Sequence, residues 1–288
     1  MKSFVLPGFY ECFDVNAKLV DCYEQHPEMF LDDVKLECFF GAFQFSAWDG
    51  GRVFSMYQRA FKEDIERIRD FYNQHNIPIR LTYTNPEITE ESLKDPFCNL
   101  VLYELSNGMN QVLVSSDLLE EHIRQNYPAM KICSSTTKCL TTPTLVKQEL
   151  EKNYHQICLD YNMNRNVKFL ESLLQEQKDK IEFLCNAICP PGCPFRKEHY
   201  RLNGISNLNG GSSFTIDCGI KECTISTSTW DYKNNLSPED IDAYEKMGFT
   251  HFKLEGRTFN PSELVANYAR YLIKPEYYLI FINIMLST

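Results

Sequence analysis

Five cysteines lie close together in one part of the sequence, in a pattern that suits a soft metal centre. Cys185, Cys189 and Cys193 occur in LCNAICPPGCPFRKEHY, and Cys218 and Cys223 follow in TIDCGIKEC. The spacer between Cys189 and Arg196 is rich in proline and cannot form a regular helix. Loops that fix several thiolates on a rigid backbone bind soft metal ions and iron–sulfur clusters.

The spacing of these cysteines leaves the kind of centre open. Three, three, 24 and four residues separate successive members, so no Cys-x-x-Cys pair of the zinc type is present. Iron–sulfur clusters accept more varied spacing. His199 could complete a Cys/His set, or it could be an ordinary half-buried histidine. A cluster, a zinc ion and inert thiols are therefore all compatible with the pattern.

Charged residues near this segment could hold a substrate. Arg196 follows the cysteine loop, and Glu255 and Arg257 follow the last predicted strand. Arginine binds a carboxylate or a phosphate through two parallel hydrogen bonds, although an ion pair bracing the protein is an equal alternative. Asp160 and Asn162 could line the same site or could serve only as turn and cap residues.

Short apolar runs that alternate with helical patterns must position these residues. Eight runs have the character of strands, and most precede an amphipathic stretch, which predicts a TIM-like parallel (β/α)8 barrel within the α/β class. An open doubly wound sheet is the alternative, but no Gly-x-Gly-x-x-Gly follows the first strand. The predicted strands span 4–9, 34–40, 79–84, 111–115, 131–135, 156–161, 180–185 and 251–256.

Helices are expected between the strands, and one connection is unusually long. The expected N-caps are Asp117 and Ser237. A single domain covers 1–288, with a cysteine-rich loop insertion at 186–232, and long connections of this kind are usually functional. The predicted helices span 56–75, 117–127, 164–176, 237–247 and 261–273.

The composition limits the partners and the location. The 288 residues carry a net charge of −10, which argues against a broad nucleic-acid-binding face. The start of the chain does not resemble a signal peptide, and its cysteines suit a reducing compartment, so we expect a cytoplasmic protein. The last apolar run, YYLIFINIML, is too short to span a bilayer and predicts a buried terminal segment.

Two segments together resemble a known family. NAICPPGCPFRKEHY with TIDCGIKEC, followed by GFTHFKLEGRTFNPSELVANYARYL, is similar to the collagenase-like U-32 peptidase family. The family motif Lys-Ile-Glu-Gly-Arg reads Lys-Leu-Glu-Gly-Arg here, at 253–257. The resemblance covers roughly residues 180–273, and extends to the first half only in the order of its elements.

The resemblance implies a barrel with a 4Fe–4S cluster in several members, which are linked to oxygen-independent hydroxylation of RNA bases or of a quinone precursor. Carried over residue by residue, it implies Cys189, Cys193, Cys218 and Cys223 as cluster ligands, with Cys185 as a substitute. The first pair is closer together here than in the family, and the last pair is further apart.

The sequence therefore favours an iron–sulfur enzyme that acts on a small molecule or an RNA base. Glu255, Arg257 and Arg196 would be its catalytic residues. A metal-dependent peptidase that uses zinc is a second hypothesis. A third is a non-catalytic subunit that pairs with another barrel of the same family.

Overall fold

Eight parallel strands close into one barrel in the computed structural model, which describes residues 1–53, 60–211 and 232–287. Each strand pairs with the next in sequence, and β8 pairs with β1. The predicted fold class is thus confirmed, and the doubly wound sheet is wrong. The strands are β1 (Lys2–Pro7), β2 (Val34–Gly41), β3 (Ile79–Tyr83), β4 (Gln111–Val114), β5 (Lys131–Ser134), β6 (Ile157–Leu159), β7 (Ile181–Leu184) and β8 (His251–Lys253).

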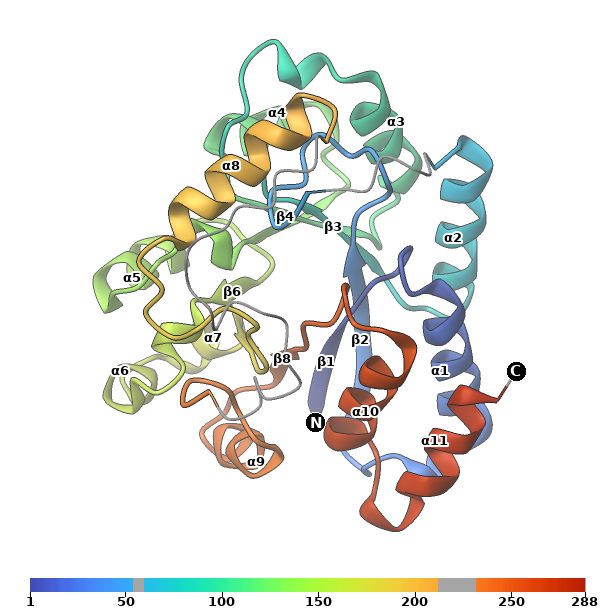
Figure 1. The fold of residues 1–288 in the computed structure, drawn as a ribbon. Helices are drawn as coiled ribbons and strands as arrows, with labels where there is room; N and C mark the ends of the chain where they lie inside the picture. The colour runs from blue at the N-terminus through green and yellow to red at the C-terminus, as the bar shows by residue number, and fades with distance from the viewer. Residues whose placement is uncertain (54–59, 212–231, 288) are drawn as a thin grey trace.

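Helices surround the barrel, and α10 and α11 lie side by side at the end of the chain (Figure 1). Short 3-10 turns occupy Pro27–Met29, Ser92–Lys94, Thr136–Lys138, Tyr161–Met163 and Pro275–Tyr277. The helices are α1 (Phe13–Gln25), α2 (Lys62–Gln74), α3 (Pro96–Leu105), α4 (Asp117–Asn126), α5 (Pro143–Leu150), α6 (Val167–Glu171), α7 (Gln175–Lys178), α8 (Arg196–Leu208), α9 (Pro238–Lys246), α10 (Pro261–Leu272) and α11 (Tyr278–Leu286).

Local capping explains several helix starts and corrects two predictions. Ser237 caps α9 as expected, with a reciprocal bond from its N–H to the Asp240 carboxylate. Ser116, not Asp117, caps α4, because its hydroxyl accepts the Leu119 N–H. The helix predicted over 164–176 is wrong: the chain forms two short helices there, and Leu174 is the N-cap residue of the second.

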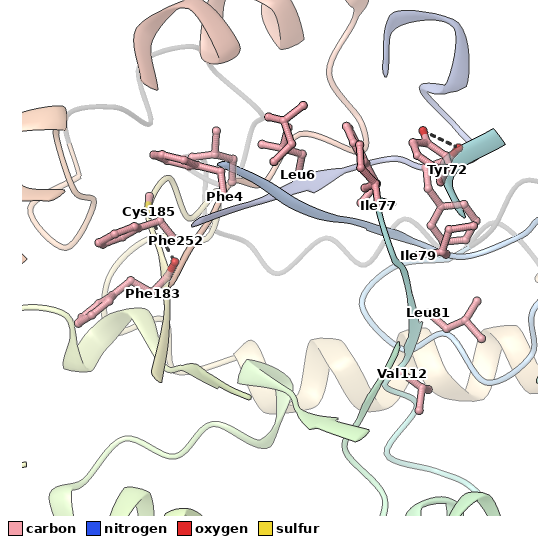
Figure 2. Packing of buried hydrophobic residues seen from close by; sticks show 14 of the residues in the cluster. Phe4, Leu6, Tyr72, Ile77, Ile79, Leu81, Val112, Phe183, Cys185 and Phe252 are labelled. Atoms are coloured by element: carbon pink, nitrogen blue, oxygen red, sulfur yellow. Dashed lines mark hydrogen bonds between the residues drawn. The ribbon is translucent and has the colours of Figure 1, made fainter. Parts of the chain in front are cut away.

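The main hydrophobic core lies between the barrel wall and the outer helices. Outward-facing aromatic side chains of neighbouring strands meet there, with ring centres of Phe4 and Phe252 5.9 Å apart and of Phe183 and Phe252 6.0 Å apart (Figure 2). Burial of these rings is the main favourable term that holds the helices against the barrel.

The inside of the barrel is polar at the end where the strands begin. Arg80 on β3 is fully buried and reaches across to the Glu182 carboxylate on β7. Its other nitrogens donate to the side-chain oxygens of Gln111, at 2.7 Å, and Gln156. The buried guanidinium is thus surrounded by acceptors, as a charge in a protein interior requires.

The chain between β7 and α9 makes a long excursion, at the place where a cysteine-rich insertion was expected. It leaves the barrel wall at Cys185 and returns at Leu236, whose N–H donates to the Cys185 carbonyl at 2.7 Å. The described part of the excursion contains α8, so this connection is more than a loop. The remaining part, 212–231, lies outside the described residues.

The terminal run forms α11 and is only partly buried. Phe281 and Met285 face the protein, whereas Leu279 is 78% exposed. The prediction of a buried segment is therefore wrong for the outer face of this helix. No helix among the described residues is both long enough and apolar enough to cross a membrane.

Candidate functional site

The strand ends that carry the predicted site residues open into one cavity of about 490 Å³. Parallel barrels place their active sites at this end, because all the βα loops meet there. Phe40, Leu113 and Leu184 give the cavity an apolar wall, and threonine, arginine and lysine side chains supply polar groups. The size and the mixed lining suit a small ligand.

Helix α8 closes one side of this cavity. Asn207 fastens it to the loop after β2 by donating to the carbonyls of Asp49, at 2.6 Å, and Arg52, at 2.7 Å. Gly204 faces Asn85, and a Cβ atom at position 204 would lie only 2.2 Å from the Asn85 Oδ1. The close approach therefore requires glycine. The residues of this excursion that line the cavity are Ile188, Cys189, Arg196, His199, Tyr200 and Asn203.

Glu255 lies in the cavity wall directly after β8. Its Oε2 accepts the Ile188 N–H at 2.8 Å, and its own N–H donates to the Asn186 Oδ1 at 2.6 Å. Burial raises the pKa of Glu255 above its ordinary value, although three neighbouring cations oppose this effect. A carboxyl group of this kind can hold a proton and exchange it with a ligand. The opposing cations are Lys253, Arg52 and Arg196.

Arg257 is committed to protein partners. Its Nε and Nη2 donate to the Glu11 Oε1 at 3.0 and 2.8 Å, and Nη2 also reaches the Asp49 Oδ2 at 2.9 Å. Its Nη1 donates to the Thr82 hydroxyl at 3.0 Å. The guanidinium thus joins the loops after β1 and β2 to β3. No hydrogen bond or ion pair among the described residues joins Arg257 to Glu255.

Arg196, at the start of α8, also has a carboxylate partner. Its Nη1 and Nη2 donate to the two oxygens of Asp160, and Nη2 reaches the Thr136 carbonyl at 2.8 Å. The guanidinium carbon lies 4.5 Å from the centre of the Tyr161 ring. Asp160 also accepts the Asn162 N–H at 3.0 Å, so its cap role and its place beside the site coexist.

Two cations in the cavity were missed by the sequence reasoning. Lys253 is 4% exposed, and its Nζ lies 3.9 Å from the centre of the Phe40 ring and 3.9 Å from the Glu182 Oε1. Arg52 is half-buried in the loop after β2. Burial, and next the charge of Arg257, lower the pKa of Arg52 to about 10. Strand alternation offered a signal for Lys253, which lies two residues before Glu255 and so shares its inward face.

The described cysteines of the excursion have different surroundings. Cys189 is half-buried, lines the cavity and packs on the apolar cluster around Tyr161. Cys193 is half-buried and does not line the cavity. Cys185 is fully buried in the outer core, where burial raises the pKa of its thiol well above the ordinary value. Its Sγ contacts the Phe183 carbonyl at 3.5 Å (Figure 2).

Cys218 and Cys223 lie outside the described residues, so the four-cysteine set stays a prediction. Within the described ranges, no three His, Cys, Asp or Glu side chains come close enough to form a metal site. His199 lines the cavity, and burial lowers its pKa, so its imidazole is neutral in the folded protein at neutral pH.

Comparison with solved structures gives a match to the U32 peptidase Mk0906. The TM-score is 0.54 at 13% sequence identity, and the alignment covers 89% of this chain and 93% of the other. The likeness at this identity is one of fold: the chain has a U32-peptidase-like barrel. No protein-family model matches the sequence, and a search of curated proteins found no match.

Proposed function

We propose that this chain is an enzyme of U32-peptidase-like fold that performs an oxygen-independent hydroxylation, or a related redox step, on a small molecule or an RNA base. The support is one observation: Cys189 and Arg196 of the excursion line the same cavity as Glu255, which follows β8. A thiol, a half-buried acid and an anchored cation thus lie within reach of one ligand.

A 4Fe–4S cluster bound by Cys189, Cys193, Cys218 and Cys223 would supply the redox chemistry. Of these ligands, Cys189 is at the cavity wall and Cys193 is four residues further along a proline-containing turn, which is compatible with a cluster at the edge of the cavity. The protein would then orient the substrate, while Glu255 holds or releases the proton that the reaction requires.

Metal analysis of anaerobically isolated protein tests this proposal. We expect iron and sulfide in equal amounts, and the loss of both in Cys189→Ala, Cys193→Ala, Cys218→Ala and Cys223→Ala. Cys22→Ala is the matched control, because this buried thiol lies on α1. Protein without iron, or iron retained by all four variants, would contradict the proposal.

A metal-dependent peptidase is the second candidate, favoured by the likeness to a solved U32 peptidase. A bound zinc ion would activate water, and Glu255 would accept its proton. The same metal analysis separates the candidates, because this one expects zinc without sulfide.

A role as a non-catalytic partner of a related barrel would be supported by co-purification of that second subunit together with full metal loading but no turnover.

A further inference from the structure

We propose that the cavity binds a small anion, and that Arg52 and Lys253 hold its acidic group next to Glu255. This inference rests on the proposed function, because it names the substrate class of the same cavity. It depends on which of the cavity cations are hydrogen-bonded to a carboxylate and which are not.

Four cations line the cavity, and two of them are neutralised within the protein. Arg257 binds Glu11 and Asp49, and Arg196 binds both oxygens of Asp160. These pairs leave little charge available for a ligand.

The other two cations, Arg52 and Lys253, are not balanced in the same way. Arg52 forms no ion pair within 4.0 Å with any residue that the structure describes, although Glu11 and Asp49, the partners of Arg257, also act on it electrostatically. The nearest acid to Lys253 is Glu182, at 3.9 Å, which is beyond hydrogen-bond distance. The other oxygen of Glu182 is bound to Arg80, so a single carboxylate faces two buried cations.

Glu255 alone does not balance this positive charge. It is the one carboxylate among the cavity-lining residues that the structure describes, and burial raises its pKa above the ordinary value. A buried cation without a partner is costly, and the cost is removed when a bound anion pairs with it. Arg52 and Lys253 are both near enough to Glu255 to act on it electrostatically, as is Arg196.

Other polar groups of the cavity also lack partners. The hydroxyl oxygens of Thr84 and Thr136 are buried and form no hydrogen bond with the described residues. Both hydroxyls can donate to acceptor oxygens. The opposite wall, formed by Phe40, Leu113 and Leu184, offers apolar contact. The lining therefore fits a ligand in which a carboxylate or phosphate group is attached to a small aliphatic or aromatic group.

Calorimetric titration of the full-length protein with three probes tests the proposal. Benzoate and phenyl phosphate carry the two candidate acidic groups, and benzamide is the neutral analogue. We expect at least one anion to bind about tenfold or more tightly than benzamide. The anion with the higher affinity shows whether the cavity prefers a carboxylate or a phosphate group.

Variants then assign the binding to the named residues. Arg52→Gln and Lys253→Met should each weaken anion binding by about tenfold and leave benzamide binding unchanged, whereas Arg52→Lys should keep most of the affinity. Arg67→Gln and Lys62→Met, on the exposed face of α2, are the controls. Thermal unfolding of each variant confirms that it is folded.

Two outcomes would overturn the proposal: no detectable binding of either anion, or anion binding that is unaffected in both Arg52→Gln and Lys253→Met. Iron and sulfide content, measured on the same preparations, reports separately on the proposed redox chemistry. Anion binding by protein without a cluster would refute only that chemistry, and a cluster without anion binding would refute only the anion site.

Discussion

The Arg257 guanidinium connects residues that are far apart in the sequence. Glu11 follows β1, Asp49 follows β2 and Thr82 is part of β3, and all three accept hydrogen bonds from this one side chain. The acids are 14% and 2% exposed, so they depend on the arginine for charge compensation. We therefore assign Arg257 a bracing role, which positions Arg52 and the other loop residues of the cavity.

Replacing Arg257 by methionine should cost about 3–5 kcal/mol of unfolding free energy, because the buried Asp49 carboxylate and the half-buried Glu11 carboxylate lose their partner. Urea denaturation measures this loss. Arg67→Met, at an exposed arginine of α2, should change stability by less than about 0.5 kcal/mol. A loss below 1 kcal/mol in Arg257→Met would show that the brace is unimportant.

The raised pKa of Glu255 predicts that the stability of the protein depends on pH. Because burial raises its pKa in the folded protein, the folded state binds more protons than the unfolded state as the pH rises above the ordinary carboxyl value of about 4.3. The contribution of this group to stability therefore falls as the pH rises through that window. Glu255→Gln, which resembles the protonated form, removes this loss.

We expect Glu255→Gln to be more stable than the natural chain at pH 7 and equally stable near pH 4. Urea denaturation at several pH values checks the prediction. A variant that is less stable at pH 7, or a difference that does not change with pH, would contradict it.

At the scale of elements, α8 decides the shape of the cavity. It lies against the loops after β2 and β3 through Asn207 and through the contact between Gly204 and Asn85. Its first turns supply four cavity-lining side chains. The position of α8 therefore sets which ligands fit.

Gly204→Ala should push α8 away from Asn85, at a cost of about 1–3 kcal/mol. We expect faster hydrogen exchange in 196–208 and little change in α2. Gly51→Ala is the matched control, because a Cβ atom there meets its nearest neighbours at 3.8 Å. Equal exchange in both variants would mean that the close approach does not hold the helix.

The elements that sequence predicted well are those with a local signal. All eight strands were found to within a few residues, because each is a short apolar run between polar turns. Ser116 and Asp117 are both good caps, so the choice between them depended on backbone geometry. The break between α6 and α7 was missed because the apolar stripe continues through it.

The site was predictable only in part, for a physical reason. Glu255, Arg257 and Arg196 follow strands or the cysteine loop, so topology alone brings them to the mouth of the barrel. Their partners are 246 residues away for Arg257 and 36 for Arg196, and no local pattern encodes such contacts. Arg52 and Lys253 matter because neither has a carboxylate within hydrogen-bond distance among the described residues, and that property also appears only in three dimensions.

At the scale of the whole molecule, a buried network crosses the barrel. Arg80 on β3 binds Glu182 on β7, and the Gln156 side chain links Arg80 to His251 and Glu37. The network joins opposite sides of the wall at the end away from the cavity. It replaces part of the apolar packing that usually fills such barrels.

Arg80→Met should destabilise the protein by about 3–5 kcal/mol, because the buried Glu182 carboxylate loses its hydrogen-bonded partner and keeps only the Lys253 Nζ at 3.9 Å. The double variant Arg80→Met with Glu182→Leu should lose less than the sum of the two single losses, since neither charge then remains. Chemical denaturation of all four proteins gives the coupling energy. Additive losses would show that the two side chains act independently.

The hydrogen bond between the Leu236 N–H and the Cys185 carbonyl has a consequence for how this protein can change. It brings both ends of the excursion to one point, so the barrel closes whatever length of chain runs between them. Shortening, extending or exchanging that stretch adds little strain to the scaffold. The segment that lines one side of the cavity can therefore be re-engineered as a separate unit while the eight-stranded framework is kept.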